Sequence, residues 1–317
     1  MASTKEISRR IKSISSTKKI TKAMEMVAAS KMRKAIEAVL KTRTYANLSW
    51  ETVLHLAQLA ESKSEASHPL LAKRTEIKKA AVILITSNRG MCGGYNSVVI
   101  NKAKESIDKH EVETDVVLFG KKGAAIYSSD KYKVTAQFEK DDLLNSIKDV
   151  KPIVSLMIKD YLSGKYDKVL VAYTDFVNSA KQIPRVKQLL PLETKTEDKY
   201  LGVVGKTSQI GVDEDYITEK SKKHLSSDSF VYDYTFEPSP FEVLDLIIPR
   251  LLEIQLYQAF LEANASEHSS RMMAMHQATE AAGDMVSEFT LYYNKARQAS
   301  ITNEIAEISA GANALAE

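Results

Sequence analysis

The sequence predicts an α/β protein in which a central Rossmann-like α/β domain lies between two long terminal helices that pair as an antiparallel coiled coil. Three observations lead to this fold. Both ends of the chain repeat apolar residues at coiled-coil spacing, the middle changes to short β-rich runs between helical stretches, and the two ends carry opposite charge. We therefore expect an N-terminal coiled-coil helix over residues 1–66, an α/β domain over residues 76–236 and a C-terminal coiled-coil helix over residues 239–316.

The N-terminal helix is predicted by a long apolar seam. Steps of alternately four and three residues from Ile7 to Ala60 land mostly on apolar side chains. The polar positions cluster at Lys18–Glu25, so we expect the seam to be interrupted there. No proline or glycine occurs from Met1 to Ser67. A helix over Thr4–Ala60 would be roughly 85 Å long, which is far longer than an ordinary globular helix.

The C-terminal helix is predicted by the same pattern. From Ile247 to Ala296 the same steps follow a mostly apolar seam, and a second stripe from Ile301 to Leu315 continues it after a register slip. Pro249 lies within this pattern, where it would kink the helix or mark its first turn. The whole helix would span on the order of 100 Å.

The charges of the two ends support their pairing. Residues 1–44 carry twelve Lys and Arg against three acids, a net charge of +9, whereas residues 250–317 carry four Arg and Lys against nine acids, a net charge of −5. Opposite charge fits two helices that lie against each other, or a basic end that meets an acidic partner. Because both apolar seams belong to one chain, an antiparallel pair is the simplest way to bury them.

The middle of the chain alternates strands with helices, which predicts a parallel sheet with helices on both faces. The expected strands are AAVILIT (80–86), TDVVLFG (114–120), YKVTAQF (132–138) and DKVLVAYTDF (167–176). The expected helices are Ser97–His110, Lys122–Ser129 and Asp141–Leu162. Two later runs, IPRVKQLLPLE (183–193) and SFVYDYTFEPSP (229–240), are expected at the edge of the sheet. Residues 195–228 between them are polar with little periodicity, and we expect a mobile surface insertion there.

The loop SNRGMCGGYN (Ser87–Asn96) follows the first expected strand, where many phosphate-binding sites begin. It lacks the Gly-Lys-Ser/Thr of a nucleoside triphosphate loop, and its glycine spacing is not that of a dinucleotide loop. A tight strand-to-helix connection is the favoured interpretation, and a nucleotide site remains the alternative. Cys92, the only cysteine, lies in this loop without a sequence neighbour suited to act as its base.

Other candidate sites are weaker. The six histidines include no pair at i and i+4, so we expect no metal site, and the methionine clusters are explained by packing between helices. The basic run SRRIKSISSTKKITK (8–22) leaves RNA binding open as an alternative, although it contains no aromatic residue to stack on bases. No apolar run approaches the ~18 residues of a membrane span.

Three separated motifs together resemble the gamma subunit of the F-type ATP synthase. They are KKITKAMEMVAASKMRKA (Lys18–Ala35), SNRGMCGGYN (Ser87–Asn96) and the segment from ASEHSSRMMAM to NKARQASITNEIAEISAGANAL (Ala265–Leu315). The resemblance covers essentially the whole chain. It implies the central rotor shaft of a proton-driven synthase, which transmits torque between the membrane c-ring and the catalytic alpha/beta ring. It implies no catalytic, cofactor-binding or metal-binding residue in this chain.

The resemblance also implies partners and contact residues. The chain would contact the alpha and beta subunits of the catalytic ring, the epsilon subunit and the c-ring, as one copy per complex and without nucleic acid. The complex would place it peripherally at the cytoplasmic face of a bacterial cell membrane. Contacts with the alpha/beta ring are expected at Lys22, Met24, Lys31, Arg33, Arg297, Gln298 and Thr302. Contacts with epsilon and the c-ring are expected at Tyr232, Tyr234 and Glu237. A nucleotide-dependent α/β enzyme with helical arms and a coiled-coil RNA-binding protein remain the alternatives.

Overall fold

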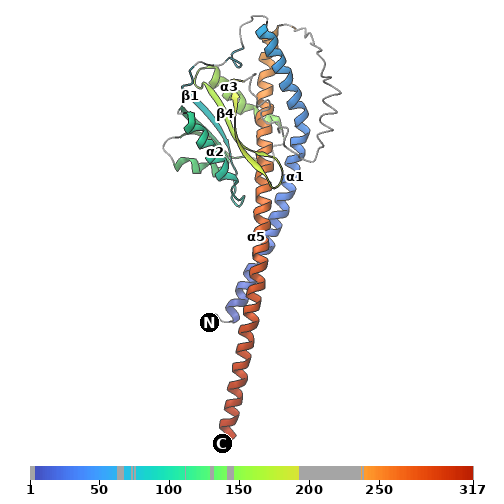
Figure 1. Ribbon diagram of the computed structural model, residues 1–317, viewed down its shortest axis with the longest axis vertical. Helices are drawn as coiled ribbons and strands as arrows, with labels where there is room; N and C mark the ends of the chain where they lie inside the picture. Colours follow the sequence, from blue (N-terminus) through green and yellow to red (C-terminus); the bar gives the residue numbers. More distant parts are fainter. Residues whose placement is uncertain are drawn as a thin grey trace. The chain divides into compact units, whose positions relative to one another are not determined.

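The computed structural model describes residues 4–62, 68–72, 74, 76–110, 112–128, 132–140, 146–192, 237 and 239–316. These residues fall into two compact units, Met1–Ala29 with Arg271–Glu317, and Ser30–Ser270. The two long helices, α1 (Thr4–Ser62) and α5 (Pro240–Ala316), each contribute to both units (Figure 1). The predicted terminal helices are therefore confirmed. The expected insertion at 195–228 and the edge run at 229–236 lie outside the described residues.

The α/β domain in the unit Ser30–Ser270 is built on one five-stranded sheet. Its strands are β1 (Lys79–Ile85), β2 (Glu113–Phe119), β3 (Lys133–Phe138), β4 (Lys168–Phe176) and β5 (Gln182–Leu190). They lie in the order β3-β2-β1-β4-β5, and the first four are parallel, as the sequence predicted. The last strand, β5, is antiparallel to β4 because the connection between them is far too short for a crossover. It forms the edge of the sheet, where Pro184 is tolerated.

Helices cover both faces of this sheet. Helix α2 (Tyr95–His110) packs on one face, where Val82 and Leu84 of β1 meet Val99. The opposite face carries α3 (Lys151–Leu162) and the first part of α5, which meet the alternate β1 residues such as Ile83. Burial on both sides explains why β1 is a continuous apolar run rather than an alternating one.

The helix predicted over Asp141–Leu162 is wrong for the described residues before Lys151. The α-helix begins only at Lys151, after a short 3-10 turn at Ile147–Asp149, and 141–145 lie outside the described residues. Ser146 caps the 3-10 turn, because its hydroxyl oxygen accepts a hydrogen bond from the Lys148 N–H. The Asp149 carboxylate in turn accepts a hydrogen bond from the Ser146 N–H. Pro152 explains the late start, because proline has no N–H to donate and fits only the first turn of a helix.

Helix α5 contains the proline that the sequence placed either inside the helix or in its first turn. It begins at Pro240, capped by Ser239, whose hydroxyl oxygen accepts a bond from the Glu242 N–H at 3.3 Å. Pro249 therefore lies inside the helix rather than in its first turn, and the helix continues through it. From Leu251 to Ser269 every side chain is buried. A helix enclosed on all sides can bury apolar residues around its whole circumference, which accounts for the Leu, Ile, Ala and Phe residues of this segment. The segment also buries polar residues, among them Glu253, Gln258 and Glu262.

The Asp167 carboxylate anchors the segment before β1 through hydrogen bonds. One carboxylate oxygen accepts bonds from the N–H groups of Lys78 and Lys79 at 2.9 and 3.0 Å, and the other accepts a bond from Arg74 at 2.6 Å. Burial alone would raise the pKa of Asp167, but these backbone donors and the Arg74 guanidinium outweigh it and hold the pKa below its ordinary value. The carboxylate thus stabilises the folded chain in its charged form.

The Asp167→Asn substitution is expected to lower the free energy of unfolding by roughly 2 kcal/mol at neutral pH, because a charged acceptor of three bonds is lost. The pKa is depressed in the folded state, so this contribution is complete above the unfolded value of about 3.9 and is lost as the pH falls below it. Urea unfolding of both proteins at neutral pH and at about pH 3 should show the difference shrinking in acid. A difference that stayed constant would contradict the assignment. Glu105→Gln, on the exposed face of α2, is the control.

Candidate functional site at the sheet edge and the terminal helix pair

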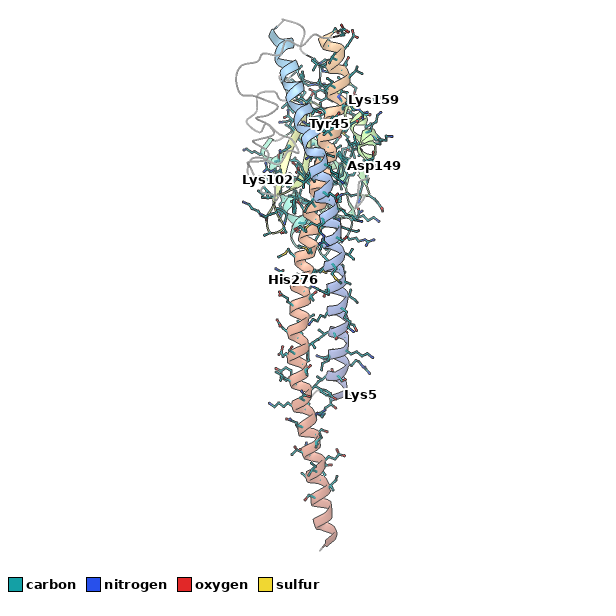
Figure 2. All side chains as sticks on the ribbon, turned by 90° about the vertical axis from the view of Figure 1, so that its right-hand side faces the viewer. Lys5, Tyr45, Lys102, Asp149, Lys159 and His276 are labelled. Atoms are coloured by element: carbon teal, nitrogen blue, oxygen red, sulfur yellow. The ribbon has the colours of Figure 1, made fainter. Side chains whose placement is uncertain are left out.

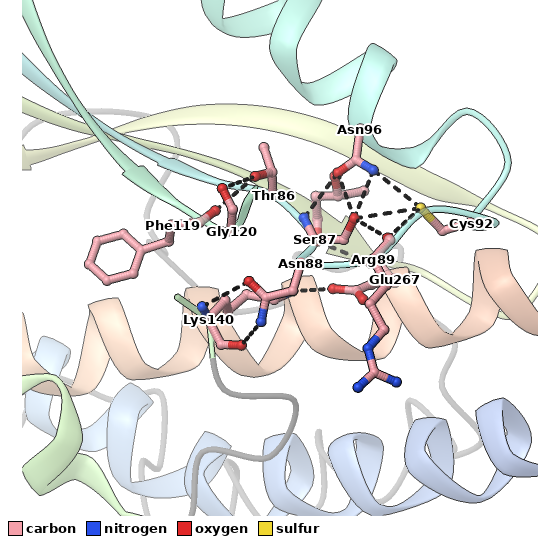
Figure 3. Close-up of polar contacts among 12 residues, drawn as sticks. Thr86, Ser87, Asn88, Arg89, Cys92, Asn96, Phe119, Gly120, Lys140 and Glu267 are labelled. Carbon is pink, nitrogen blue, oxygen red and sulfur yellow. Dashed lines mark hydrogen bonds and ion pairs between the residues drawn. The ribbon is translucent and has the colours of Figure 1, made fainter. Parts of the chain in front are cut away.

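The carboxyl edge of the sheet is where a doubly wound fold usually binds its ligand. The strand order reverses between β1 and β4, so the crevice of such folds would open beyond Ile85 and Phe176. In this chain the loop Ser87–Asn96, the residue Lys140 after β3, and helix α5 meet at that edge (Figure 3).

The loop Ser87–Asn96 is closed by its own side chains. The Ser87 N–H donates to Asn96 Oδ1 at 2.9 Å, and the Asn96 amide donates to Ser87 Oγ at 2.8 Å and to the buried Cys92 Sγ at 3.2 Å (Figure 3). Met91 and Gly93 adopt φ angles of 60° and 55°, which produce the sharp turn into α2. The side chains of Ser87, Cys92 and Asn96 thus bond to one another within the loop, which supports the tight connection over the nucleotide site.

Helix α5 supplies the groups that lie at the crevice. The Ser266 hydroxyl donates to the Thr174 carbonyl oxygen at 3.0 Å, at the end of β4. The next residue, Glu267, forms an ion pair with Lys140, and the two side chains are only 2% and 1% exposed. The main chain of Lys140 is bound in turn by the Asn88 side chain, which accepts from its N–H at 3.2 Å and donates to its carbonyl oxygen. A carboxylate of the protein itself therefore lies where related folds place a bound anion.

A row of serines extends this contact along α5 to the hairpin between β4 and β5. The Ser269 hydroxyl donates to the Ser179 carbonyl oxygen at 2.9 Å, and the Ser270 hydroxyl donates to Gln182 Oε1 at 3.1 Å. Ala263 and Ala265, both 0% exposed, keep the preceding turn of the helix narrow. The edge of the sheet thus holds α5 in place. We call these contacts of α5, with Lys140, Thr174, Ser179 and Gln182, the mount of α5.

The second candidate surface is the helix pair in the unit Met1–Ala29 with Arg271–Glu317. Residue numbers rise along α1 as they fall along α5 across the contacts, so the pair is antiparallel, as predicted. Thr279 donates to Thr21 at 2.8 Å, and His276 lies 3.4 Å from Glu25. The seam of α5 predicted from the sequence is confirmed, because its positions are the less exposed ones. In this unit they are Met272, Met275, Thr279, Ala282, Val286, Phe289, Tyr293 and Ala296.

The polar stretch in the seam of α1 is paired rather than interrupted. Thr21 and Glu25 occupy seam positions. Across the pair, Thr21 contacts Thr279, and Glu25 contacts His276, which is labelled in Figure 2. The Lys22 ammonium lowers the pKa of Glu25, against the opposing effect of burial, and His276 adds to the lowering. Polar pairs within an apolar seam fix the register of a coiled coil, since any shift leaves them unpaired.

A shallow groove beside these contacts has mixed charge. Three lysines of α1, Lys18, Lys19 and Lys22, line one side, whereas Glu280 and Asp284 line the other. Acidic side chains beside the lysines do not favour a polyanion such as RNA. The groove also contains Gly283, where a Cβ would lie 2.9 Å from the Lys18 ammonium nitrogen.

The Gly283→Ala substitution is expected to stabilise this helix pair by roughly 1 kcal/mol, because alanine is the better helix former and only the flexible end of Lys18 must move. Thermal unfolding of the subunit measures the change. Ala281→Gly, two residues away at an exposed position, should have the opposite sign. A destabilising Gly283→Ala would mean that α1 requires the glycine for close approach.

The far end of α5 has no such pairing. From Arg297 to Ala310 every side chain is exposed, including Ile301, Ile305 and Ile308 at 47%, 62% and 67%. On α1, the outer surface carries another apolar group of Ile20, Met26 and Val27, each more than half exposed. Soluble proteins rarely leave such surfaces uncovered, which indicates interaction partners for this unit.

The residues predicted to contact partners are divided between the two units, and two of them lie outside the described residues. Lys22 is exposed and paired with Glu25 at 2.9 Å, Met24 is half-buried, and Arg297, Gln298 and Thr302 are exposed on α5. Lys31 and Arg33 belong to the other unit, where Lys31 is half-buried and Arg33 is exposed. Glu237 is exposed, and Tyr232 and Tyr234 lie outside the described residues.

The sequence did not reveal the contact between Lys140 and Glu267. The pair joins residues 127 positions apart, and no local pattern links them. The one available signal was the polar cluster NASEHSS inside a segment that is otherwise apolar. Among the described helices, none is long and apolar enough to cross a membrane. Within the same residues, no group of three His, Cys, Asp or Glu is placed to hold a metal ion.

The chain is similar to known proteins over nearly its whole length. The family model described as ATP synthase matches residues 3–315. The ATP synthase gamma chain of Legionella pneumophila (strain Corby) is 40% identical over 318 residues, covering 99% of this chain and 100% of that protein. The ATP synthase gamma chain of Haemophilus influenzae (strain PittGG) is 36% identical over 319 residues, with coverage of 99% and 100%.

Two solved structures have a similar fold. A chain of the Tetrahymena thermophila mitochondrial ATP synthase central stalk and c-ring aligns with a TM-score of 0.55 at 23% identity, covering 82% of this chain and 99% of that one. A chain of the Euglena gracilis mitochondrial ATP synthase, solved as OSCP, F1 and c-ring, aligns with a TM-score of 0.60 at 16% identity, covering 98% and 94%.

Proposed function

Because this chain belongs to the family of ATP synthase gamma chains, we propose a specific set of contacts through which it works in the complex. As a member of that family it is the central rotor subunit of an F-type ATP synthase and is not itself catalytic. The nucleotide-dependent enzyme considered from the sequence is therefore rejected. No observation on the described residues favours the RNA-binding alternative.

The alpha and beta subunits of the catalytic ring contact the rotor through both long helices. On α1 the contact residues are Lys22, Met24, Lys31 and Arg33, and on α5 they are Arg297, Gln298 and Thr302. The exposure of Lys22, Arg33 and the three α5 residues supports this assignment, as does the net positive charge of the first part of α1. A rotor with different side chains on its different sides binds each catalytic subunit unequally at every angle, and such differences in contact free energy couple rotation to the state of each site.

The free end of α5 turns within the ring. It carries exposed isoleucines and few charges, so it makes apolar contacts that resist rotation less than directional ion pairs would. The pairing of α5 with α1 as far as Ala296, and its exposure beyond that residue, support this division between a shaft and a tip.

Epsilon and the c-ring bind near Tyr232, Tyr234 and Glu237. The synthase is proton-driven, holds one copy of this chain, and carries it peripherally at the cytoplasmic face of a bacterial cell membrane. This proposal is supported by the full-length similarity to bacterial gamma chains and by the c-ring that both similar structures include.

The observation that carries the proposal is the full-length identity to gamma chains together with a helix pair whose α5 continues beyond α1. Co-expression with alpha and beta subunits tests it. We expect one copy of this chain to co-purify with a six-membered alpha/beta ring, and Lys22→Glu combined with Arg33→Glu to weaken that association. ATP hydrolysis by the isolated chain, or a ring that assembles without binding it, would refute the proposal.

A further inference from the structure

We propose that the buried ion pair between Lys140 and Glu267 is the positioning contact that fixes α5 against the α/β domain when torque is applied. The inference rests on the proposed rotor function, in which force enters at the α/β domain and leaves through the long helices. Both residues belong to the unit Ser30–Ser270, so the contact lies within one compact body.

The pair is held from several elements of that unit. Lys140 comes two residues after β3, and its ammonium group lies 5.8 Å from the ring centre of Tyr95, the first residue of α2. Its main chain is bound on both sides by Asn88, which follows β1 (Figure 3). The lysine therefore cannot follow a displaced helix without breaking its contacts to the loop after β1 and to the first residue of α2.

Stability alone does not account for this pair. Withdrawing two charges from water is costly, and well-packed apolar residues of similar size often serve a fold equally well or better. What an ion pair adds is a unique position, because a displaced partner leaves a buried charge uncompensated. The pair thus distinguishes one placement of α5 from its neighbours.

The rest of the contact provides less resistance to sliding or twisting. The Leu, Ile, Ala and Phe side chains that α5 buries before Glu267 make apolar contacts, which are non-directional, although the same segment also buries polar residues such as Gln258 and Glu262. The serine contacts to Thr174 and Ser179 are neutral hydrogen bonds to carbonyl oxygens, which are weaker than charge-assisted ones. Of the contacts that α5 makes to Lys140, Thr174 and Ser179, the buried ion pair is therefore the one that most resists displacement.

The position along the helix suits this role. Glu267 lies three residues before Ser270, where the unit ends, and α5 continues from Arg271 in the other unit. A contact at this point holds the helix at the end of its buried segment, immediately before it leaves the α/β domain's unit. Without such a contact, α5 could twist where it leaves the α/β domain's unit. That twist would add to the torsional deformation of the helix pair.

The test uses the assembled complex in membrane vesicles with the double variant Lys140→Met/Glu267→Met, which replaces both charges with side chains of similar length. The control is Lys102→Met/Glu105→Met, an exposed pair on α2 with a 2.9 Å contact. We expect both complexes to assemble and to hydrolyse ATP at the normal rate without load. Against an opposing ion gradient, the Lys140/Glu267 variant should transport at least about twofold fewer ions per ATP, while the control remains unchanged.

A second measurement separates positioning from simple stability. With the ring end of the rotor immobilised, the angular fluctuations of a probe on the α/β domain should widen in the double variant, although its melting temperature is unchanged or raised. Equal fluctuations and equal transport under load would overturn the inference while leaving the rotor function intact. A wild-type chain that failed to join the ring or to support transport would instead refute the proposed function.

Discussion

The Ala278→Pro substitution is expected to uncouple ATP hydrolysis from ion transport while leaving the α/β domain folded. Ala278 lies inside α5, in the unit Met1–Ala29 with Arg271–Glu317. Proline has no N–H to donate, and its ring collides with the carbonyl group of Ala274, at a cost of about 3 kcal/mol or more. The break falls between Met275 and Thr279, which are seam positions facing α1. The helix pair would lose its register at the polar contacts that define it.

The measurement is the number of ions transported per ATP by the assembled complex in vesicles, which should fall to background. Ala278→Gly is the matched control, because it keeps the N–H and costs only about 1 kcal/mol of helix stability. A chain that ends at Ile308 should be tolerated better than the proline, since the side chains from Arg297 to Ala310 are exposed. If truncation and proline reduced coupling equally, the division into a paired shaft and a low-contact tip would be wrong.

The seam that this substitution breaks was predictable from the sequence because its cause is periodic. A helix that buries one side needs an apolar side chain every three or four residues, whatever lies opposite. Opposite charge at the two ends indicated the partner. Thr21 and Glu25 were misjudged as an interruption, because a polar residue is recognised as part of a seam only when its partner is known. Thr279 and His276 lie more than 250 positions away in the chain.

The parallel strands were also predictable, and the sense of the last strand was not. A strand covered on both faces is apolar throughout, as in β1, and alternation with helices indicates crossovers. The direction of β5 depends on the length of the turn before it, and the sequence places no glycine there to mark a hairpin. The start of α3 was missed for a simpler reason, since the proline signal at Pro152 was available but was given too little weight.

The contacts that hold α5 against the α/β domain could not be predicted from the sequence, and the reason is physical. A buried charge is stable only when an opposite charge reaches it, and neither Lys140 nor Glu267 carries any local mark of that pairing. The glycine-rich loop was correctly interpreted as a connection, but its part in the mount depends on Asn88, which resembles any polar loop residue until Lys140 is placed beside it. Long-range polar contacts are decided by the assembled fold.

The Gly120→Ala substitution should destabilise the α/β domain by about 3–5 kcal/mol. Gly120 ends β2 with a φ of 94°, and a Cβ there would overlap the main chain of Thr86, with the carbonyl carbon at 2.7 Å. Gly120 and Thr86 are both held in place by hydrogen bonds. The Gly120 N–H donates to the Phe138 carbonyl oxygen at 2.9 Å, and the Thr86 hydroxyl donates to the Phe119 carbonyl oxygen at 2.8 Å. These bonds connect the carboxyl ends of β1, β2 and β3, from which the loops of the α5 mount begin.

Gly93→Ala separates the effect of space from the effect of backbone conformation. Gly93 also has a positive φ, 55°, but no atom lies within 4 Å of the position that an added Cβ would occupy, so only the left-handed conformation is penalised, at roughly 1–2 kcal/mol. The free energies of unfolding of both variants, measured in urea, should therefore differ by about 1–4 kcal/mol, with Gly120→Ala the less stable. Equal losses would mean that the edge relaxes around Gly120. In that case the three strand ends are less firmly joined than their hydrogen bonds indicate, and the mount on them would yield under torque as well.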